Sequence, residues 1–97
     1  MTYKLKFTSL SWKEWQKLDS SIQVQLKKKL DERLENPHVL TDKLRGFTAV
    51  YKIKLRASGY RLVYEVEDEE ITVLVVAIGK RNPIALPVAL DQNLDFG

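Results

Sequence analysis

The sequence predicts an α+β fold in which an N-terminal strand and an antiparallel helical hairpin precede a three-stranded antiparallel sheet. Three patterns predict it: residues 3–7 alternate polar with apolar, residues 12–34 place apolar side chains at helical spacing, and residues 51–78 return to strand patterns. With 97 residues, 44% of them hydrophobic, the chain is long enough for one core and too short for two. We therefore expect a single domain over residues 1–97, with a divergent tail at 82–97.

The predicted helical hairpin follows the first strand, residues 3–7. Two capping boxes mark the helix starts, because each has a serine that can accept a hydrogen bond from a first-turn amide and an acidic or amide residue three positions later. These boxes begin at Ser11 and Ser20. The apolar stripe of the first, short helix consists of Trp12, Trp15 and Leu18. The second helix repeats Ile or Leu at positions 22, 26, 30 and 34, and we expect it to end before Asn36.

The strands of the second half begin with an alternating run at residues 51–56, which returns at residues 60–67 after a hairpin signal at residues 58–59. The last strand, residues 71–78, is almost continuously apolar. That pattern predicts a central strand covered on both faces, because a strand with one solvated face would alternate.

The length of the hairpin loop decides which cations share a face. If residues 58–59 form the whole loop, Arg56 lies opposite Arg61 and Lys54 lies opposite Val63, so that these three cations and Lys52 share one face of the sheet. A three-residue loop would turn Arg61 to the other face, because side chains alternate along a strand. Like charges opposite one another are unfavourable unless an anion lies between them, which is a weak sign of a phosphate site.

Charge is unevenly distributed along the chain. Residues 43–64 hold six cations and no acid, whereas residues 65–70 hold five acids in six positions, so the net charge of +3 hides a polarised molecule. The six cations are Lys43, Arg45, Lys52, Lys54, Arg56 and Arg61. A cationic strand face is typical of phosphate binding. We interpret the acids as a solvated turn that discourages edge pairing, because a calcium loop needs a glycine anchor that is absent here.

Composition excludes several classes of protein. The chain has no cysteine and one histidine, His38, so a disulfide framework, a thiolate or His-rich metal site and a Cys-His nucleophile are excluded. We expect no cofactor and no metal, and His38 is interpreted as a surface loop residue. The longest apolar run, residues 73–78, is far too short to span a bilayer, and residues 1–8 lack the apolar core of a signal peptide. A cytoplasmic protein without membrane contact is expected.

Two other groups of residues have structural explanations. The three lysines at 27–29 fan out around the second helix, which favours a solvated face over a phosphate cradle, although a partner contact is the alternative. The tryptophans and the three tyrosines at 51, 60 and 64 are interpreted as packing residues rather than as platforms for stacked bases.

The cationic face could act on RNA as well as bind it. RNA carries its own nucleophile, the 2′-hydroxyl, so cleavage needs a base, an in-line geometry and cations that stabilise charge on the phosphate. A lysine among other cations can serve as the base, and Lys54 has such neighbours. From the pattern alone, three interpretations stay open: a nucleic-acid-binding protein, a metal-independent ribonuclease, and a basic face that only confers solubility.

Residues 43–64 and 75–81 closely resemble the RelE family, the toxins of bacterial type II toxin–antitoxin modules, and residues 13–18 and 25–30 strengthen the resemblance. It covers roughly residues 1–81. The resemblance implies a small α+β fold, similar to that of microbial ribonucleases, with a helical hairpin packed on a twisted, mostly antiparallel sheet. It also implies an mRNA interferase that inhibits translation by cleaving messenger RNA in the ribosomal A site.

The resemblance assigns roles to eight cations. The implied catalytic residues are Lys52, Lys54, Arg61 and Arg81. Lys54 would be the general base toward the 2′-hydroxyl, and the other three would stabilise the phosphate and its transition state. The implied contacts to RNA or the ribosome are Lys43, Arg45, Arg56 and Lys80. The implied partners are a RelB-like antitoxin, the A site of the small (30S) ribosomal subunit and mRNA, with operator DNA bound only through the antitoxin.

The tail departs from the family pattern. RelE-like toxins continue with a basic helical tail that holds a tyrosine for acid–base chemistry, but residues 82–97 contain no Lys, Arg or Tyr, and Pro87 stands at the tyrosine position. Two prolines four residues apart also oppose a helix there. Reduced activity is the expectation, and the alternative is an inactive homologue that still binds its antitoxin and takes part in co-repression.

Overall fold

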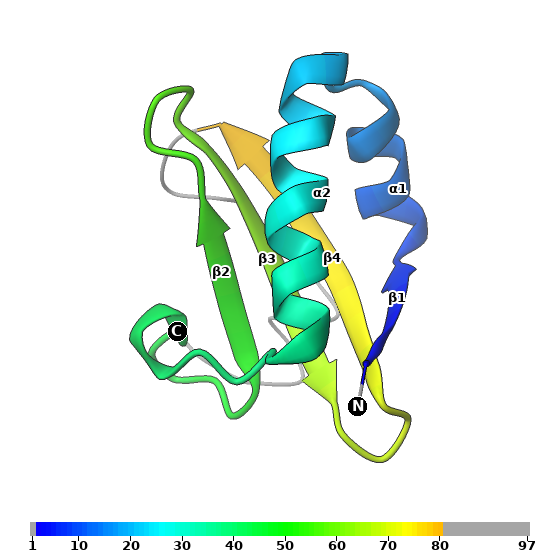
Figure 1. Ribbon diagram of the computed structural model, residues 1–97, viewed down its shortest axis with the longest axis vertical. Coiled ribbons are helices and arrows are strands. Elements are labelled where there is room, and N and C mark those ends of the chain that lie inside the picture. The colour runs from blue at the N-terminus through cyan, green and yellow to red at the C-terminus, as the bar shows by residue number, and fades with distance from the viewer. Residues whose placement is uncertain (1, 81–97) are drawn as a thin grey trace.

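The computed structural model describes residues 2–80, which form a four-stranded sheet with two helices on one face (Figure 1). In chain order the elements are β1 (Lys4–Phe7), α1 (Ser9–Gln16), α2 (Ser20–Glu35), the 3-10 turn η1 (Leu40–Asp42), β2 (Val50–Lys54), β3 (Tyr60–Glu67) and β4 (Thr72–Lys80). The strand order is β1-β4-β3-β2. Strands β2, β3 and β4 are antiparallel, as predicted, and β1 adds to β4 in parallel. The α+β class is confirmed.

Helix α1 begins earlier than its capping box predicts. Thr8 is the N-cap, and its side-chain oxygen accepts a hydrogen bond from the Ser11 amide at 3.1 Å. Ser11 itself is fully buried, and its hydroxyl donates to the Val75 carbonyl at 2.7 Å. The prediction of Ser11 as a cap was wrong, because Thr8 supplies the capping oxygen and the serine is used to attach α1 to β4.

Helix α2 begins at Ser20 and ends at Glu35, before Asn36 as predicted. Its N-cap is Asp19, so the capping box at Ser20 is not formed. The side-chain amide of Gln23 instead donates to the Trp15 carbonyl at 2.8 Å, which joins the two helices. The predicted apolar stripe of α2 is confirmed: Ile22, Leu26 and Leu30 are buried and Leu34 packs beside them. Trp15 of α1 packs against the core, and so does Leu18, which lies just after the end of the helix, whereas Trp12 is 45% exposed.

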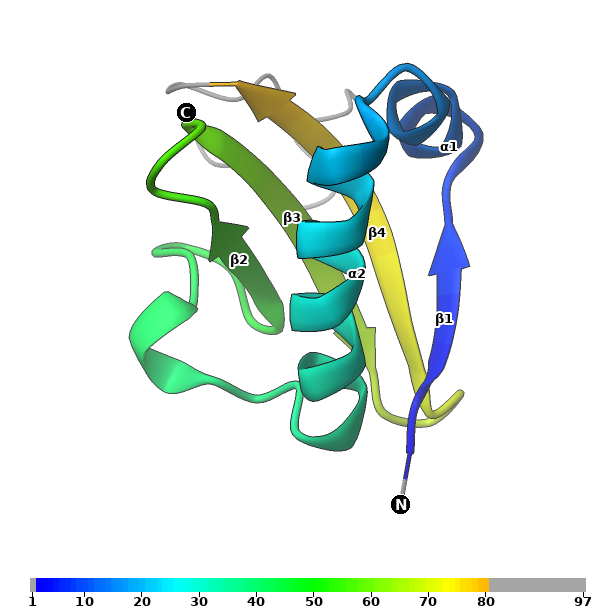
Figure 2. The ribbon, with the colours of Figure 1, turned by 45° about the horizontal axis from the view of Figure 1, so that its top comes forward.

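Hydrophobic clusters lie on both faces of the sheet. The larger cluster fills the space between the helices and the sheet, where Figures 1 and 2 show α2 crossing the strands. The smaller cluster lies on the opposite face, which we call the open face, and consists of Phe47, Val50, Val63, Val76 and Ala77. Strand β4 lies between β1 and β3 and contributes to both clusters, as its apolar sequence predicts. Among residues 2–80, no helix is long and apolar enough to cross a bilayer.

The hairpin loop between β2 and β3 is longer than predicted. Lys54 lies opposite Arg61 and Lys52 opposite Val63, so the two-residue loop was wrong. Residues 56–59 form the loop, which is closed by hydrogen bonds from the Leu55 amide to the Tyr60 carbonyl (2.8 Å) and from the Gly59 amide to the Leu55 carbonyl (2.9 Å). Gly59 has φ +78°, a backbone conformation that glycine adopts without steric cost. Four-residue hairpin loops are most often built around a type I turn, whereas the type I′ turn belongs to two-residue loops.

The shift has a simple consequence for the predicted face. Relative to the expected pairing, the register moves by two residues, and a shift of two leaves each side chain on the same face. Lys52, Lys54 and Arg61 therefore still share one face, as predicted. Arg56 does not, because it lies in the loop rather than in a strand.

Candidate nucleic-acid interface

Three cations lie together on the open face of the β2–β3 hairpin. Tyr51, Ile53 and Leu62 belong to the core beneath the helices. Because side chains alternate, their neighbours in the strands point the other way. These neighbours are Lys52, Lys54 and Arg61. The open face thus presents cations at the loop end of the hairpin and apolar side chains at its other end.

Lys54 and Arg61 are directly opposed across the two strands. Opposed residues have Cβ atoms about 5 Å apart, and like charges at that separation destabilise a hairpin. Within residues 2–80 neither side chain, nor that of Lys52, has a carboxylate within ion-pair distance. Lys54 is exposed, whereas Lys52 and Arg61 are half-buried. Cations held close together in this way can form charge-assisted hydrogen bonds to a phosphate group.

Strand β4 borders these cations without covering them. Gly79 lies opposite Arg61 and contributes no side chain. The next residue, Lys80, lies opposite Tyr60, and its ammonium group is 5.7 Å from the centre of that ring. Tyr60 packs against the core beneath the helices, so the structure places Lys80 on the helical side of the sheet. Arg81 lies outside the described residues.

The remaining predicted contacts lie in loops beside the hairpin. Lys43 forms an isolated bridge with Tyr51 and is exposed. Arg45 is exposed in the following turn, between Leu44 and Phe47, which both pack on the open-face cluster. The turn thereby holds Arg45 at the border of the open face. Gly46 has φ +88°, which lets the chain turn sharply between them.

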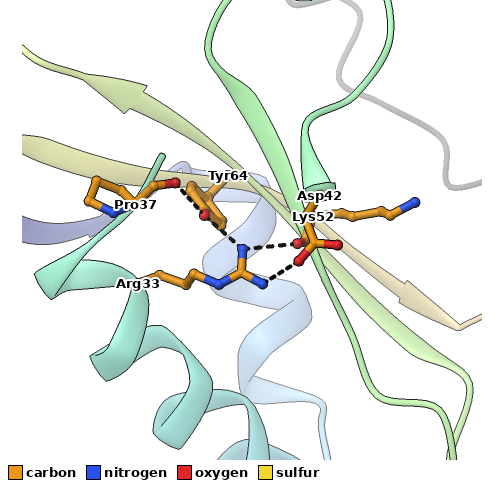
Figure 3. Close-up of polar contacts among 5 residues, drawn as sticks. All are labelled: Arg33, Pro37, Asp42, Lys52 and Tyr64. Atoms are coloured by element: carbon orange, nitrogen blue, oxygen red, sulfur yellow. Dashed lines mark hydrogen bonds and ion pairs between the residues drawn. The ribbon is translucent and has the colours of Figure 1, made fainter. Parts of the chain in front are cut away.

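A buried network behind the open face was not found by sequence reasoning (Figure 3). The guanidinium of Arg33, from α2, donates to the Lys52 carbonyl at 3.2 Å and to the Tyr64 hydroxyl at 2.9 Å, and forms an ion pair with Asp42 at 2.6 Å. The Tyr64 hydroxyl donates to the Pro37 carbonyl at 2.8 Å. The Arg33 side chain is only 15% exposed. In the sequence, only the position of Arg33 between Leu30 and Leu34 hints at its burial, on a helix whose lysines are solvated.

The network fixes β2 from its helical side. Burial raises the pKa of Tyr64, and the neighbouring Arg33 opposes that rise. Tyr64 therefore stays a neutral hydroxyl that both donates and accepts. Its ring stacks on Tyr51 with centroids 5.6 Å apart, which confirms the prediction that these tyrosines are packing residues. The backbone of Lys52 is thus held against a rigid support while its side chain faces outward.

His38 and Asp68 connect three distant parts of the chain. His38 lies 3.1 Å from the Tyr51 hydroxyl and 2.9 Å from Asp68, and the Tyr3 hydroxyl donates to Asp68 at 2.7 Å. The hydrogen bond from Tyr3, and to a smaller extent the one with His38, lowers the pKa of the Asp68 carboxyl. One acid of the predicted solvated turn is therefore used in a contact. Within residues 2–80, no group of three or more His, Asp or Glu side chains is arranged to hold a metal ion.

Comparisons with known proteins agree with this architecture. Residues 5–84 match the family described as the ParE toxin of the type II toxin–antitoxin system parDE. The chain is 56% identical over 81 residues to the mRNA interferase toxin RelE of Escherichia coli K12, covering 84% of this chain and 85% of that protein. It is also 56% identical over 81 residues to the mRNA interferase RelE of Shigella flexneri, with the same coverage.

Solved structures of RelE toxins are also similar to this chain. The isolated E. coli RelE toxin matches with a TM-score of 0.80 and 46% identity over 96% of each chain. A chain of the intact E. coli RelBE toxin–antitoxin complex matches with a TM-score of 0.80 and 53% identity, covering 84% of this chain and 99% of that chain. The chain therefore belongs to the family of RelE and ParE toxins of type II toxin–antitoxin systems and is a RelE-type member of it.

Proposed function

We propose that the protein is a ribosome-dependent, metal-independent endoribonuclease that cleaves mRNA in the ribosomal A site. The observation that carries the proposal is the opposed pair of Lys54 and Arg61 beside Lys52, on an open sheet face without a carboxylate partner in residues 2–80. The relatives named mRNA interferase support the same reaction. The protein would act in the cytoplasm, as one domain, because its substrate is a translated message.

In the proposed reaction Lys54 accepts the proton of the 2′-hydroxyl. The 2′-oxygen attacks the adjacent phosphorus, a new P–O2′ bond forms, and the bond to the 5′-oxygen of the next nucleotide breaks. The products are a 2′,3′-cyclic phosphate and a 5′-hydroxyl, whose oxygen takes its proton from water. Lys52, Arg61 and Arg81 would stabilise the charge that develops on the phosphate oxygens. Arginine suits this role because its guanidinium can contact two phosphate oxygens at once. The Arg33 network holds the Lys52 backbone in place during this step.

Cleavage of ribosome-bound mRNA tests the proposal. Ribosomes carrying a defined message are mixed with saturating protein, and the 5′ ends of the products are mapped. We expect cuts within the A-site codon and a single-turnover rate at least about 100-fold lower for Lys54→Ala, because general-base catalysis contributes about that factor or more. Lys28→Ala, an exposed lysine on α2, is the matched control. Intact messages with the wild-type protein, or equal rates for the two variants, would refute the proposal.

We further infer that the protein binds a RelB-like antitoxin, and operator DNA only through it. The matching chain from the E. coli RelBE toxin–antitoxin complex supports an antitoxin partner. Co-expression with a RelB-like antitoxin should yield a complex that survives purification and restores growth. Operator binding by the toxin without its partner would contradict the second part.

A second candidate function is an inactive toxin that still binds its antitoxin and takes part in co-repression. It is favoured by the tail, because residues 82–97 have no Lys, Arg or Tyr. The test compares the natural protein with a version that carries a basic tail containing a tyrosine. Cleavage by the second version alone, with equal antitoxin binding by both, would establish this alternative. Equal cleavage by both would show that the tail is not needed.

A further inference from the structure

A second cationic feature lies beyond the edge of β2, next to the open face. A pocket of about 210 Å³, open to solvent on one side, lies between α2, η1 and the outer edge of β2. Its lining residues are Lys29, Arg33, Asp42, Ile53, Lys54 and Arg56. Four of the six are cations, and the one carboxylate, Asp42, is already paired with Arg33 at 2.6 Å. The pocket therefore has cationic groups available for an anion.

The cations reach the pocket from three separate elements. Lys29 precedes Arg33 by four residues, so both project from the same side of α2. Arg56 comes from the hairpin loop and Lys54 from the end of β2. Within residues 2–80, neither Lys29 nor Arg56 has a carboxylate within 4.0 Å. Lys27, two residues before Lys29, differs because it pairs with Asp31 at 2.7 Å on an exposed surface.

The backbone of β2 adds a donor at this edge. β2 is the last strand of the sheet, and the carbonyls of Val50 and Lys52 point outward, where they accept from the Leu44 amide (2.8 Å) and the Arg33 guanidinium (3.2 Å). The amide of Leu55 points inward and bonds Tyr60. Because inward and outward groups alternate along an antiparallel strand, the Lys54 amide points outward at the end of the edge that borders the pocket. Backbone amides are common ligands of phosphate groups.

We propose that this pocket binds a second phosphate of the RNA backbone, one that neighbours the scissile phosphate. The inference rests on the proposed function for the identity of the anion as RNA. Lys54 belongs to the open face and also lines the pocket, so the two sites meet at this residue. A strand of RNA crossing the end of β2 places one phosphate against the open face and another in the pocket. The pocket thereby sets the position of the nucleotide relative to Lys54.

Binding to an uncleavable RNA tests the pocket apart from catalysis. A short single strand with 2′-O-methyl groups is titrated with wild-type protein, Lys29→Gln, Arg56→Gln, the double variant and Lys28→Gln, at several salt concentrations. Lys28 is exposed, stands beside Lys29 and is not in the pocket lining, so Lys28→Gln has the same charge as Lys29→Gln. Thermal unfolding of each variant monitors the fold. None of these substitutions removes a residue that we place in the catalytic machinery.

Removing one cation that binds a phosphate of a single strand lowers the slope of log affinity against log salt by about 0.7. Because Lys29 and Arg56 would hold the same phosphate, we expect the slope of the double variant to fall by about 0.7 in magnitude and that of Lys28→Gln to stay close to the wild-type value. If the slopes change as expected but the wild-type protein does not cut ribosome-bound mRNA, the pocket is a phosphate-binding site and the proposed nuclease activity is wrong. Equal slopes for the double variant and Lys28→Gln, or no binding by the wild-type protein, would overturn the pocket whether or not cleavage occurs.

Discussion

Arg33 shows how much of this structure depends on one side chain. Its guanidinium contacts a carbonyl of β2, a hydroxyl of β3 and a carboxylate of η1, and it is largely shielded from water. Every one of these groups would be left without its charged partner if the guanidinium were removed. A buried charge without a partner destabilises a fold by more than the intact pair stabilises it. Removing the guanidinium would therefore destabilise the protein mainly through the polar groups that it leaves unpaired.

We therefore expect Arg33→Met to lower the free energy of unfolding by about 3 kcal/mol, because Asp42 then keeps a partly buried charge without a partner. Urea unfolding followed by tryptophan fluorescence measures the effect. Lys28→Met, on an exposed position of the same helix, should change the midpoint very little. Similar midpoints for the two variants would show that the network does not support the fold.

Glu65 gives a pH-dependent prediction. Burial, and to a smaller extent the negative charge of Glu67, raises the pKa of the Glu65 carboxyl in the folded protein. A raised folded pKa means that the fold binds the proton more tightly than the unfolded chain does. Its stabilising effect is thus complete below the ordinary glutamate pKa and is lost as pH rises through the folded value. Ionised Glu65 consequently destabilises the protein at neutral pH.

Glu65→Gln should therefore raise the melting temperature at pH 7 and leave it nearly unchanged at about pH 3.5, below the ordinary glutamate pKa. Thermal unfolding at the two pH values measures the difference. Glu69→Gln, an exposed acid in the turn after β3, supplies the control for a general change of charge. A gain of equal size for both variants would assign the effect to net charge rather than to Glu65.

At the scale of the element, the β2–β3 hairpin combines a stable half and an unfavourable half. Val50 and Val63 pack in the open-face cluster, whereas Lys54 and Arg61 repel one another at the loop end. The fold tolerates this repulsion because Ile53, Leu55 and Leu62, next to these cations in the chain, are buried on the opposite face of the hairpin. Hydrophobic burial thus fixes a pair of cations that would separate in an isolated hairpin.

The repulsion between Lys54 and Arg61 predicts that one substitution can raise stability while it abolishes activity. Lys54→Met should raise the free energy of unfolding by about 0.5 kcal/mol, because it removes a cross-strand repulsion. The gain should shrink in 1 M salt, where charges are screened over a few ångströms. Cleavage of ribosome-bound mRNA should be lost in the same variant. Denaturant unfolding at low and high salt provides the measurement, and a destabilised Lys54→Met would contradict the proposed repulsion.

At the scale of the whole molecule, the two faces of the sheet are used differently. The helices cover one face and bury the larger cluster, while the other face keeps its cations accessible at the loop end. Figure 2 shows the helices on the same side, with the β2–β3 loop at the opposite edge of the sheet from β1. The contacts among Tyr3, His38 and Asp68 join the residue before β1, the loop after α2 and the turn between β3 and β4.

Asp68→Asn tests this long-range connection. The folded pKa of Asp68 is lowered by its hydrogen bonds, so its contribution to stability is present above the ordinary aspartate pKa and is lost as pH falls through the folded value. Wild-type protein should melt at a higher temperature than Asp68→Asn at pH 7, and the difference should shrink as pH falls below the ordinary aspartate pKa of about 3.9. A constant difference at all pH values would indicate that the carboxylate charge is not the cause.

Local sequence patterns predicted the elements of this fold and much of the candidate site. The period-two runs identified the strands and the face of Lys52, Lys54 and Arg61, and that face was correct even though the loop was two residues longer than expected. The pattern could not predict the loop length, because residues 56–59 are closed by backbone hydrogen bonds that several sequences can form. Arg81 and the tail lie outside the described residues, so their roles stay predictions.

The sequence by itself determined the class of fold, the buried face of α2 and the polarised charge, because each depends on residues that are neighbours along the chain. Only the tertiary structure decided that Ser11 bonds to β4, that Arg33 supports Lys52 from behind, and that β1 pairs in parallel with β4. These contacts join residues far apart in the chain. Their geometry is fixed when the helices pack on the sheet, since buried polar groups must then find partners that no local pattern specifies.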